Sequence, residues 1–189
     1  MEKYIFLEVA MIKINKEINW VDEILDWLET IVFYCFIAIL LMSFVFKLIA
    51  VDGDSMLPTL KSGQRVVASN LFYEPKNGDI IIFTNKTEKL NKILVKRVIA
   101  TEGQKVSIDF KENKVYVDGK ELDEPYILEP TRVKDNFYAN EVTVPKGKVF
   151  VLGDNRNNST DSRSNAVGMV PVENIVGKAV FRLFPFKVY

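Results

Sequence analysis

The longest apolar run in the chain lies near its N-terminus. Residues 30–46 (TIVFYCFIAILLMSFVF) carry no charge, Lys47 interrupts the run, and residues 48–51 continue it. About 20 apolar residues, each rising about 1.5 Å, are enough for a helix to cross a bilayer. Trp27 and Lys47 stand near the two ends, where an interfacial indole and a snorkelling amine are expected. The pattern therefore predicts a transmembrane helix over residues 28–51.

A buried core helix or the apolar part of a cleaved signal peptide would give a similar run. A cleaved signal is usually shorter, begins nearer the N-terminus and ends in small residues. Here 29 residues precede Thr30 and the run ends at residues 50–53 (AVDG), so we prefer the membrane span. Both flanks carry a few lysines, and the positive-inside rule leaves the orientation undecided. Residues 4–14 are fairly apolar, and either a helix on the membrane surface or an ordinary N-terminal segment fits them.

From Asp52 onward, short runs rich in Val, Ile and Phe alternate with turn residues, which is typical of an all-β domain. Asp118-Gly119 indicates a tight hairpin. Residues 105–145 are more polar and are predicted to be a small insertion. We therefore expect one N-terminal transmembrane helix followed by a mainly β domain over residues 52–189. The predicted strands lie at 64–68, 80–84, 93–100, 105–110, 114–117, 142–144, 149–152 and 176–183.

The composition excludes several classes of protein and site. Lys+Arg and Asp+Glu both number 25, so the formal net charge is zero and nothing favours nucleic acid as a partner. The chain has no histidine, which excludes Ser-His-Asp triads, Cys-His pairs and His-containing metal sites within it. The single cysteine, Cys35, lies in the apolar run and can form neither an internal disulfide nor a four-Cys zinc site. A hydrolase of this composition needs Lys, Asp, Glu or a terminal amine as its base.

The first segment that could carry chemistry is 53–60 (GDSMLPTL), directly after the apolar run. Gly53 permits a positive φ, and Pro58 fixes its own φ and favours extended geometry before it. Ser55 therefore lies in a bent, constrained stretch. A nucleophilic serine fits this stretch, but on this segment alone a helix-capping or turn serine is the commoner explanation.

The second segment is the predicted strand over 93–99 (ILVKRVI), which places one cation on each of two apolar faces because side chains alternate. Lys96 shares a face with Leu94 and Val98, and Arg97 lies on the other. Burial would lower the pKa of Lys96 from about 10.4 towards about 7–8, at a cost of roughly 4 kcal/mol. Folds bear such a cost mainly where a neutral amine has a task. An exposed edge strand with two solvated charges is the alternative.

The third segment, 153–163 (GDNRNNSTDSR), follows the predicted strand over 149–152. Its small, polar and charged residues exclude it from an apolar core, and a flexible surface loop is one explanation. Its two Asp and two Arg residues can also pair, and paired charges would order the loop. An ordered polar loop at the end of an apolar strand is a common place for a functional site.

Together these segments resemble type I signal peptidases, in the short form found in Gram-positive bacteria. The shared order is a membrane anchor, GDSMLPTL, GDIIIF at 78–83, KRVIATEG at 96–103 and VFVLGDNRNNSTDSR at 149–163. The likeness extends from about Thr30 to Gly177, and the combination is far more specific than any of its parts. It implies a signal-peptidase-like β domain and a serine endopeptidase with a Ser-Lys dyad. The absence of histidine agrees with such a dyad.

The resemblance also implies roles for matching residues. Ser55 would be the nucleophile, Lys96 the general base, and the Ser55 backbone N–H part of the oxyanion hole. Some members use a serine two residues before the nucleophile as a second donor, and here that position is Gly53, so this donor is missing. Ser159 would orient Lys96. The structural ion pairs would be Asp161–Arg163 and Asp154–Arg97. The pocket for small substrate residues at −1 and −3 would be lined by Val51, Gly53, Met56, Leu60, Leu94 and Val95.

The implied substrates are preproteins with signal peptides, cut beside the lipid bilayer, with the export channel as a further partner and without a cofactor or metal. Residues 1–27 would be cytoplasmic and the catalytic domain extracytoplasmic. Two alternatives stay open. A self-cleaving repressor-like protease shares the Ser-Lys chemistry but carries a DNA-binding domain and no membrane span. A membrane-tethered, non-catalytic β module assisting export or surface assembly would not need both Ser55 and Lys96.

Overall fold

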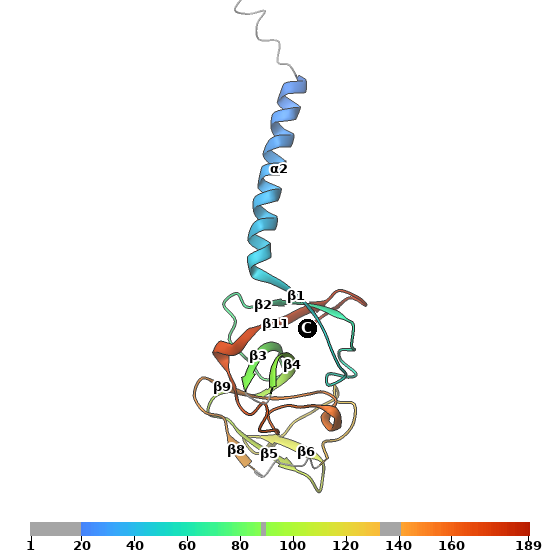
Figure 1. The fold of residues 1–189 in the computed structure, drawn as a ribbon, viewed down its shortest axis with the longest axis vertical. Helices are drawn as coiled ribbons and strands as arrows, with labels where there is room; N and C mark the ends of the chain where they lie inside the picture. The colour runs from blue at the N-terminus through green and yellow to red at the C-terminus, as the bar shows by residue number, and fades with distance from the viewer. Residues whose placement is uncertain (1–19, 88–89, 133–140) are drawn as a thin grey trace, which may run out of the picture. The chain divides into compact units, whose positions relative to one another are not determined.

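The computed structural model of the chain, drawn in Figure 1, describes residues 20–87, 90–132 and 141–189. The chain divides into two compact units, Met1–Phe44 and Val45–Tyr189. Residues 4–14, and most of the predicted cytoplasmic segment 1–27, lie outside the described residues.

The first unit is dominated by helix α2, Trp20–Val45. Asp22 and Glu23 lie in its first turn, where carboxylates interact favourably with the helix dipole. None of the helix residues is buried, and its many large apolar side chains are exposed. By length and composition the helix could therefore cross a membrane.

The bounds of α2 differ from the predicted span of 28–51 at both ends. The helix begins earlier, at Trp20, because the first turns tolerate and even favour acidic residues. It ends earlier, at Val45, because Phe46–Ala50 form strand β1, which pairs antiparallel with β2 (Arg65–Ser69). A short apolar run can be either helix or strand, and hydrophobic periodicity alone does not distinguish them. Pairing with β2 decides for a strand.

The second unit is mainly β, which confirms the predicted fold class. Its larger sheet has the strand order β1-β2-β11-β3-β4-β9-β10, with β12 paired to β11, and a second sheet has the order β7-β6-β5-β8. Each predicted run overlaps an observed strand, whereas β1, β7, β10 and β12 have no counterpart among the predicted runs. The remaining strands are β3 Ile80–Thr87, β4 Leu90–Ala100, β5 Lys105–Asp109, β6 Lys114–Val117, β7 Lys120–Glu121, β8 Glu141–Thr143, β9 Lys148–Leu152, β10 Val170–Pro171, β11 Ile175–Arg182 and β12 Lys187–Val188.

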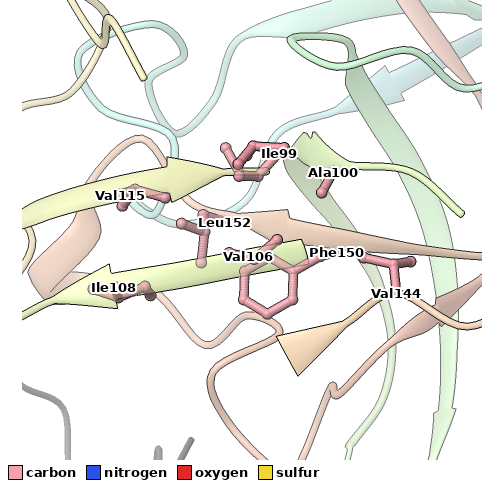
Figure 2. Close-up of a cluster of buried hydrophobic side chains, with 9 residues drawn as sticks. Ile99, Ala100, Val106, Ile108, Val115, Val144, Phe150 and Leu152 are labelled. Carbon is pink, nitrogen blue, oxygen red and sulfur yellow. The ribbon is translucent and has the colours of Figure 1, made fainter. Parts of the chain in front are cut away.

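The smaller sheet is built from the segment predicted as an insertion, and an apolar cluster joins it to the larger sheet (Figure 2). Strands β4 and β9 contribute Ile99, Ala100, Phe150 and Leu152, and strands β5 and β6 contribute Val106, Ile108, Val115 and Val117. Burying a large aliphatic or aromatic side chain contributes about 1.5–3 kcal/mol. The insertion is therefore held firmly against the main sheet.

The predicted hairpin at Asp118-Gly119 is confirmed. Val117 pairs with Lys120 across a two-residue turn, and both turn residues have positive φ, 51° for Asp118 and 77° for Gly119. These angles belong to a type I′ turn, whose twist matches that of the flanking strands. The hairpin fixes the register of β7, from which the chain continues towards the site described next.

Candidate active site

Ser55 lies in a tight turn that follows strand β1. The Gly63 N–H closes the base of this turn by donating to the Val51 carbonyl oxygen at 2.9 Å. Met56 and Leu60, which follow the serine, are fully buried in the core. This turn, residues 51–63, which we call the serine turn, is thus anchored by its apolar side chains while Ser55 stays half-buried.

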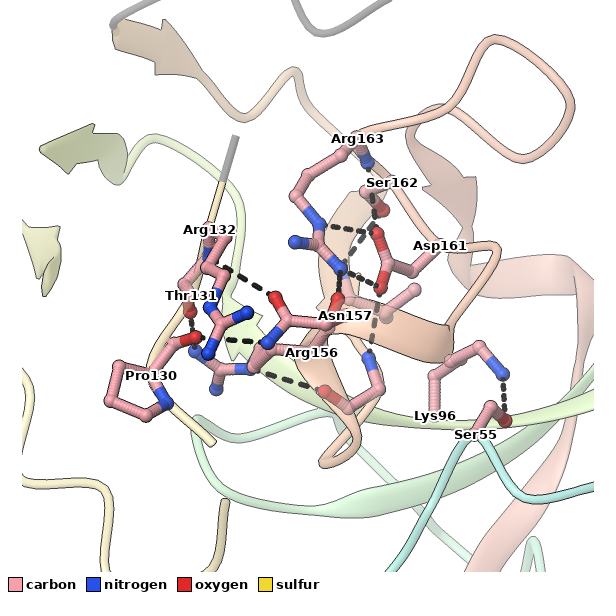
Figure 3. Close-up of polar contacts among 12 residues, drawn as sticks. Ser55, Lys96, Pro130, Thr131, Arg132, Arg156, Asn157, Asp161, Ser162 and Arg163 are labelled. Carbon is pink, nitrogen blue, oxygen red and sulfur yellow. Dashed lines mark hydrogen bonds and ion pairs between the residues drawn. The ribbon is translucent and has the colours of Figure 1, made fainter. Parts of the chain in front are cut away.

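Lys96 projects from the middle of strand β4. Pairing with β3 places it opposite Ile81, and it shares a face with Leu94 and Val98, as the alternation of the strand predicts. The lysine is only 2% exposed, so the edge-strand alternative does not hold. Its Nζ lies 2.7 Å from Ser55 Oγ (Figure 3) and 3.0 Å from the carbonyl oxygen of the preceding residue. An amine and a hydroxyl at this distance can exchange a proton.

The segment 153–163, which we call the site loop, holds the Ser55 backbone from its other side. The Asn155 N–H donates to the Ser55 carbonyl oxygen at 3.0 Å, and the Asn155 side-chain amide donates to the Asp54 carbonyl oxygen at 3.1 Å. Most of the site loop is buried, so it is not the flexible surface loop that its polar composition allows. Among the described residues, the Ser55 N–H donates to no acceptor. This leaves it available to an oxyanion.

Gly153, at the start of the site loop, leaves no room for a side chain. A Cβ at this position would lie 2.5 Å from Ser159 Cβ and 2.6 Å from the Ser55 carbonyl oxygen. Ser159 itself is buried, and its hydroxyl is a hydrogen-bond partner of Asp161. The absence of a side chain at Gly153 therefore allows the serine turn and the site loop to touch.

An ion pair with the buried carboxylate of Asp154 ties Arg97, the neighbour of Lys96, to the site loop. Arg97 forms two parallel bonds with Asp154, from Nε to Oδ1 at 2.8 Å and from Nη2 to Oδ2 at 2.7 Å. Asp154 also accepts a bond from the Thr59 hydroxyl at 2.5 Å. Burial would lower the pKa of Arg97, but the bonds and charge of Asp154 outweigh burial and raise the pKa, so the guanidinium stays charged. The pair joins strand β4, the serine turn and the site loop.

The second ion pair lies within the site loop. Arg163 donates to Asp161 through Nε and Nη2, both at 2.8 Å, and neither side chain is exposed. Burial would raise the pKa of Asp161, but the bonds and charge of Arg163, with bonds from Ser159 and the Gly153 N–H, hold that pKa below its usual value of 3.8. The stability that Asp161 contributes is therefore complete above about pH 4 and is lost as the pH falls through its folded-state pKa.

We expect Asp161→Asn to lower the free energy of unfolding by about 3–5 kcal/mol at pH 7, because it leaves a buried guanidinium uncompensated. The difference from wild type should shrink at pH 3, where the wild-type carboxyl begins to lose its advantage. Urea unfolding of the full chain in detergent at both pH values measures it. Asp123→Asn, at an exposed position, should change little at either pH. If the difference in the free energy of unfolding between wild type and Asp161→Asn is equal or larger at pH 3 than at pH 7, the predicted direction of the pH dependence is wrong.

A groove of about 790 Å³ runs past Ser55 and Lys96. Of the predicted pocket residues, those that line it are Val51, Gly53, Met56, Leu94 and Val95. Leu60 does not line it and instead packs with Val66 in the core. The reason is local, because the Leu60 N–H bonds the Met56 carbonyl oxygen at 2.8 Å and this short turn leaves its side chain among the core residues. Ser159 lines the groove as well, beside the dyad.

Comparison with known proteins places the chain in a family. A family model described as "Signal peptidase, peptidase S26" matches residues 24–184. Signal peptidase I T of Bacillus subtilis is 38% identical over 171 residues, which cover 86% of this chain and 86% of that protein. The chain belongs to the S26 signal peptidase family.

Other relatives of this signal peptidase family member carry similar names. The probable signal peptidase I-1 of Synechocystis is 43% identical over 158 residues, covering 79% of this chain and 76% of that protein. Signal peptidase IB of Staphylococcus aureus is 38% identical over 182 residues, which cover 87% of this chain and 91% of that protein. A crystal structure of a signal peptidase I from Enterococcus faecalis is 29% identical, covers 56% of this chain and 97% of its own, and gives a TM-score of 0.45.

Family membership makes the chain a serine peptidase of a membrane-anchored family, and α2 is the helix that fits an anchor. It does not favour the repressor-like or the non-catalytic alternative. Ser55, Lys96 and Ser159 line one groove, and both predicted ion pairs form, Arg97–Asp154 and Asp161–Arg163.

Sequence reasoning missed two residues of the signal peptidase site, Gly153 and Asn155. Both lie in the motif GDNRNNSTDSR, so their segment was recognised but not their contacts with the Ser55 backbone. It also missed the burial of Arg156, whose acidic partner Glu124 lies 32 residues away in the chain. No local sequence pattern around Glu124 predicts its contact with Arg156.

Proposed function

We propose that this chain is a membrane-anchored serine endopeptidase that removes signal peptides from preproteins, with Ser55 as nucleophile and Lys96 as general base. The observation that carries the proposal is the 2.7 Å separation of Lys96 Nζ and Ser55 Oγ at the side of a groove. The names of the relatives, signal peptidase I in several bacteria, support the choice of substrate.

The proposed reaction is acyl transfer through a covalent intermediate. Ser55 Oγ attacks the scissile carbonyl carbon while its proton passes to the neutral Lys96 amine, and the Ser55 N–H stabilises the oxyanion. Lys96 then protonates the leaving amine, the C–N bond breaks, and an ester of Ser55 remains. Water, deprotonated by Lys96, releases the signal peptide and regenerates the hydroxyl. The absence of histidine leaves lysine as the base best placed for both proton transfers.

The groove supports specificity for small residues before the cleavage site. Its apolar lining includes Val51, Met56, Leu94 and Val95, all close in sequence to the dyad. Met56 is 1% exposed and Val51 4%, so they offer shallow apolar surface rather than deep pockets. Ala or another small side chain at −1 and −3 would fit such surface, whereas a large one would need the core to move.

For the membrane arrangement, we propose that α2 spans the bilayer, with residues 1–27 cytoplasmic and the β unit extracytoplasmic. In this arrangement the partners of the β unit would be the lipid surface and the preproteins that emerge from the export channel. The neutral net charge gives no reason to add nucleic acid.

Purified full-length chain in detergent, incubated with a preprotein that has Ala at −1 and −3, tests the proposal. We expect one cut after the −1 residue, identified by the mass of the mature product, and cleavage by Ser55→Ala that is slower by about 10⁴-fold or more at the same thermal stability. A wild type that leaves the preprotein intact, or a Ser55→Ala variant that cuts it within about tenfold of the wild-type rate, would overturn the assignment.

A further inference from the structure

The buried side chain of Arg156 connects the site loop to a distant part of the chain. Residues 122–132, which follow β7 and which we call the strap, supply its partners. Arg156 is 0% exposed, and its Nη1 and Nη2 bond the two Glu124 carboxylate oxygens at 2.9 and 2.5 Å. Nη1 also donates to the Thr131 hydroxyl at 3.0 Å, and Figure 3 shows this contact between Arg156 and Thr131.

The other contacts of Arg156 lead towards the dyad. Its Nε donates to the Gly153 carbonyl oxygen at 3.1 Å, and its own carbonyl oxygen accepts a bond from Arg163. Gly153 is the residue against which Ser159 and the Ser55 backbone pack. One guanidinium therefore sets the path of the loop segment that carries these contacts, and Glu124 holds that guanidinium in place.

The strap has a second attachment next to the base. The Tyr126 ring lies 4.0 Å from the guanidinium carbon of Arg97, the partner of Asp154. The Leu128 N–H donates to the Asp154 carbonyl oxygen at 3.1 Å. A cation over an aromatic face is favourable where water is excluded. The strap thus contacts Arg97 and Arg156, two of the three arginines around the site.

We propose that Glu124 is a positioning residue for the Ser55–Lys96 dyad, acting through Arg156 on the site loop. The proposal rests on the proposed function. A buried guanidinium without its carboxylate is strongly unfavourable and turns towards water. Such a turn moves the Gly153 carbonyl, and with it Ser159 and the Ser55 backbone. Displacements of about 1 Å at a catalytic group can cost about 100-fold in rate.

Glu124→Gln in the full-length chain is the test, because it keeps the shape and removes the charge. We expect kcat for preprotein cleavage to fall at least about tenfold while KM changes less than about threefold. Hydrogen exchange of peptides covering 153–163 should be faster than in wild type. Glu121→Gln is the matched control, because Glu121 is exposed and its ion-pair partner among the described residues is exposed Lys114. It should leave both readouts unchanged.

A double variant, Glu124→Met with Arg156→Met, separates positioning from stability. It removes both buried charges and is expected to restore stability, yet kcat should stay low because the bond to Gly153 is gone. If Glu124→Gln does not fold, the same readouts apply to the double variant. A folded variant with kcat within about twofold of wild type, or with unchanged exchange in the site loop, overturns the proposal. A wild type that cleaves nothing refutes the proposed function instead, and the exchange comparison still decides the role of Glu124.

Discussion

Replacing Lys96 with methionine is expected to lower kcat for preprotein cleavage by about 10⁴-fold or more. Methionine has a similar length and no basic atom, so Ser55 Oγ loses the amine that lies 2.7 Å away and that we propose accepts its proton. The substrate groove is otherwise kept, so KM should change little. Steady-state kinetics with a preprotein substrate measure both constants.

The fold should survive this change, because Lys96 is 2% exposed and methionine suits an apolar face. Thermal unfolding checks that point. Lys120→Met, at an exposed position of β7, removes a lysine that does not line the groove and should keep wild-type kinetics. A Lys96→Met variant with more than a tenth of the wild-type kcat would show that another group is the base.

Gly153→Ala is expected to lower kcat by about 100-fold or more. The added methyl group would lie 2.6 Å from the Ser55 carbonyl oxygen and 2.5 Å from Ser159 Cβ, so the serine turn or the site loop must shift. Both segments carry residues of the site, and the shift therefore reaches the dyad. The measurement is kcat at a temperature where the variant is folded, as judged by circular dichroism.

Gly177→Ala is the matched control for this variant. Its Cβ would lie 2.9 Å from the Ser69 carbonyl oxygen, a comparable backbone clash in strand β11, outside the groove. It should cost stability and leave kcat unchanged. Equal losses of kcat in the two glycine variants would mean that general loosening, rather than a local displacement of the dyad, explains the effect.

Sequence pattern predicted the site where local rules apply. Alternation along a strand is sufficient to place Lys96 among Leu94 and Val98, because side chains on one face recur every second residue. The turn at Asp118-Gly119 is equally local, since only a few residue types accept positive φ at both positions.

The errors arise where tertiary contacts decide. Phe46–Ala50 extends an apolar helix in sequence but pairs with β2 in the fold. Leu60 lies close to Ser55 in the chain, yet its side chain belongs to the core. The contact of Glu124 with Arg156 depends on how the strap packs against the site loop, which no pattern within either segment encodes.

A double-mutant cycle on Ser55 and Lys96 tests most directly whether the two residues act as one catalytic unit. Single-turnover rates on one preprotein would be compared for wild type, Ser55→Ala, Lys96→Met and the double variant. We predict that the double variant is no slower than either single variant, because each change alone removes the same step. A double variant slower by the product of the two single losses would contradict the dyad.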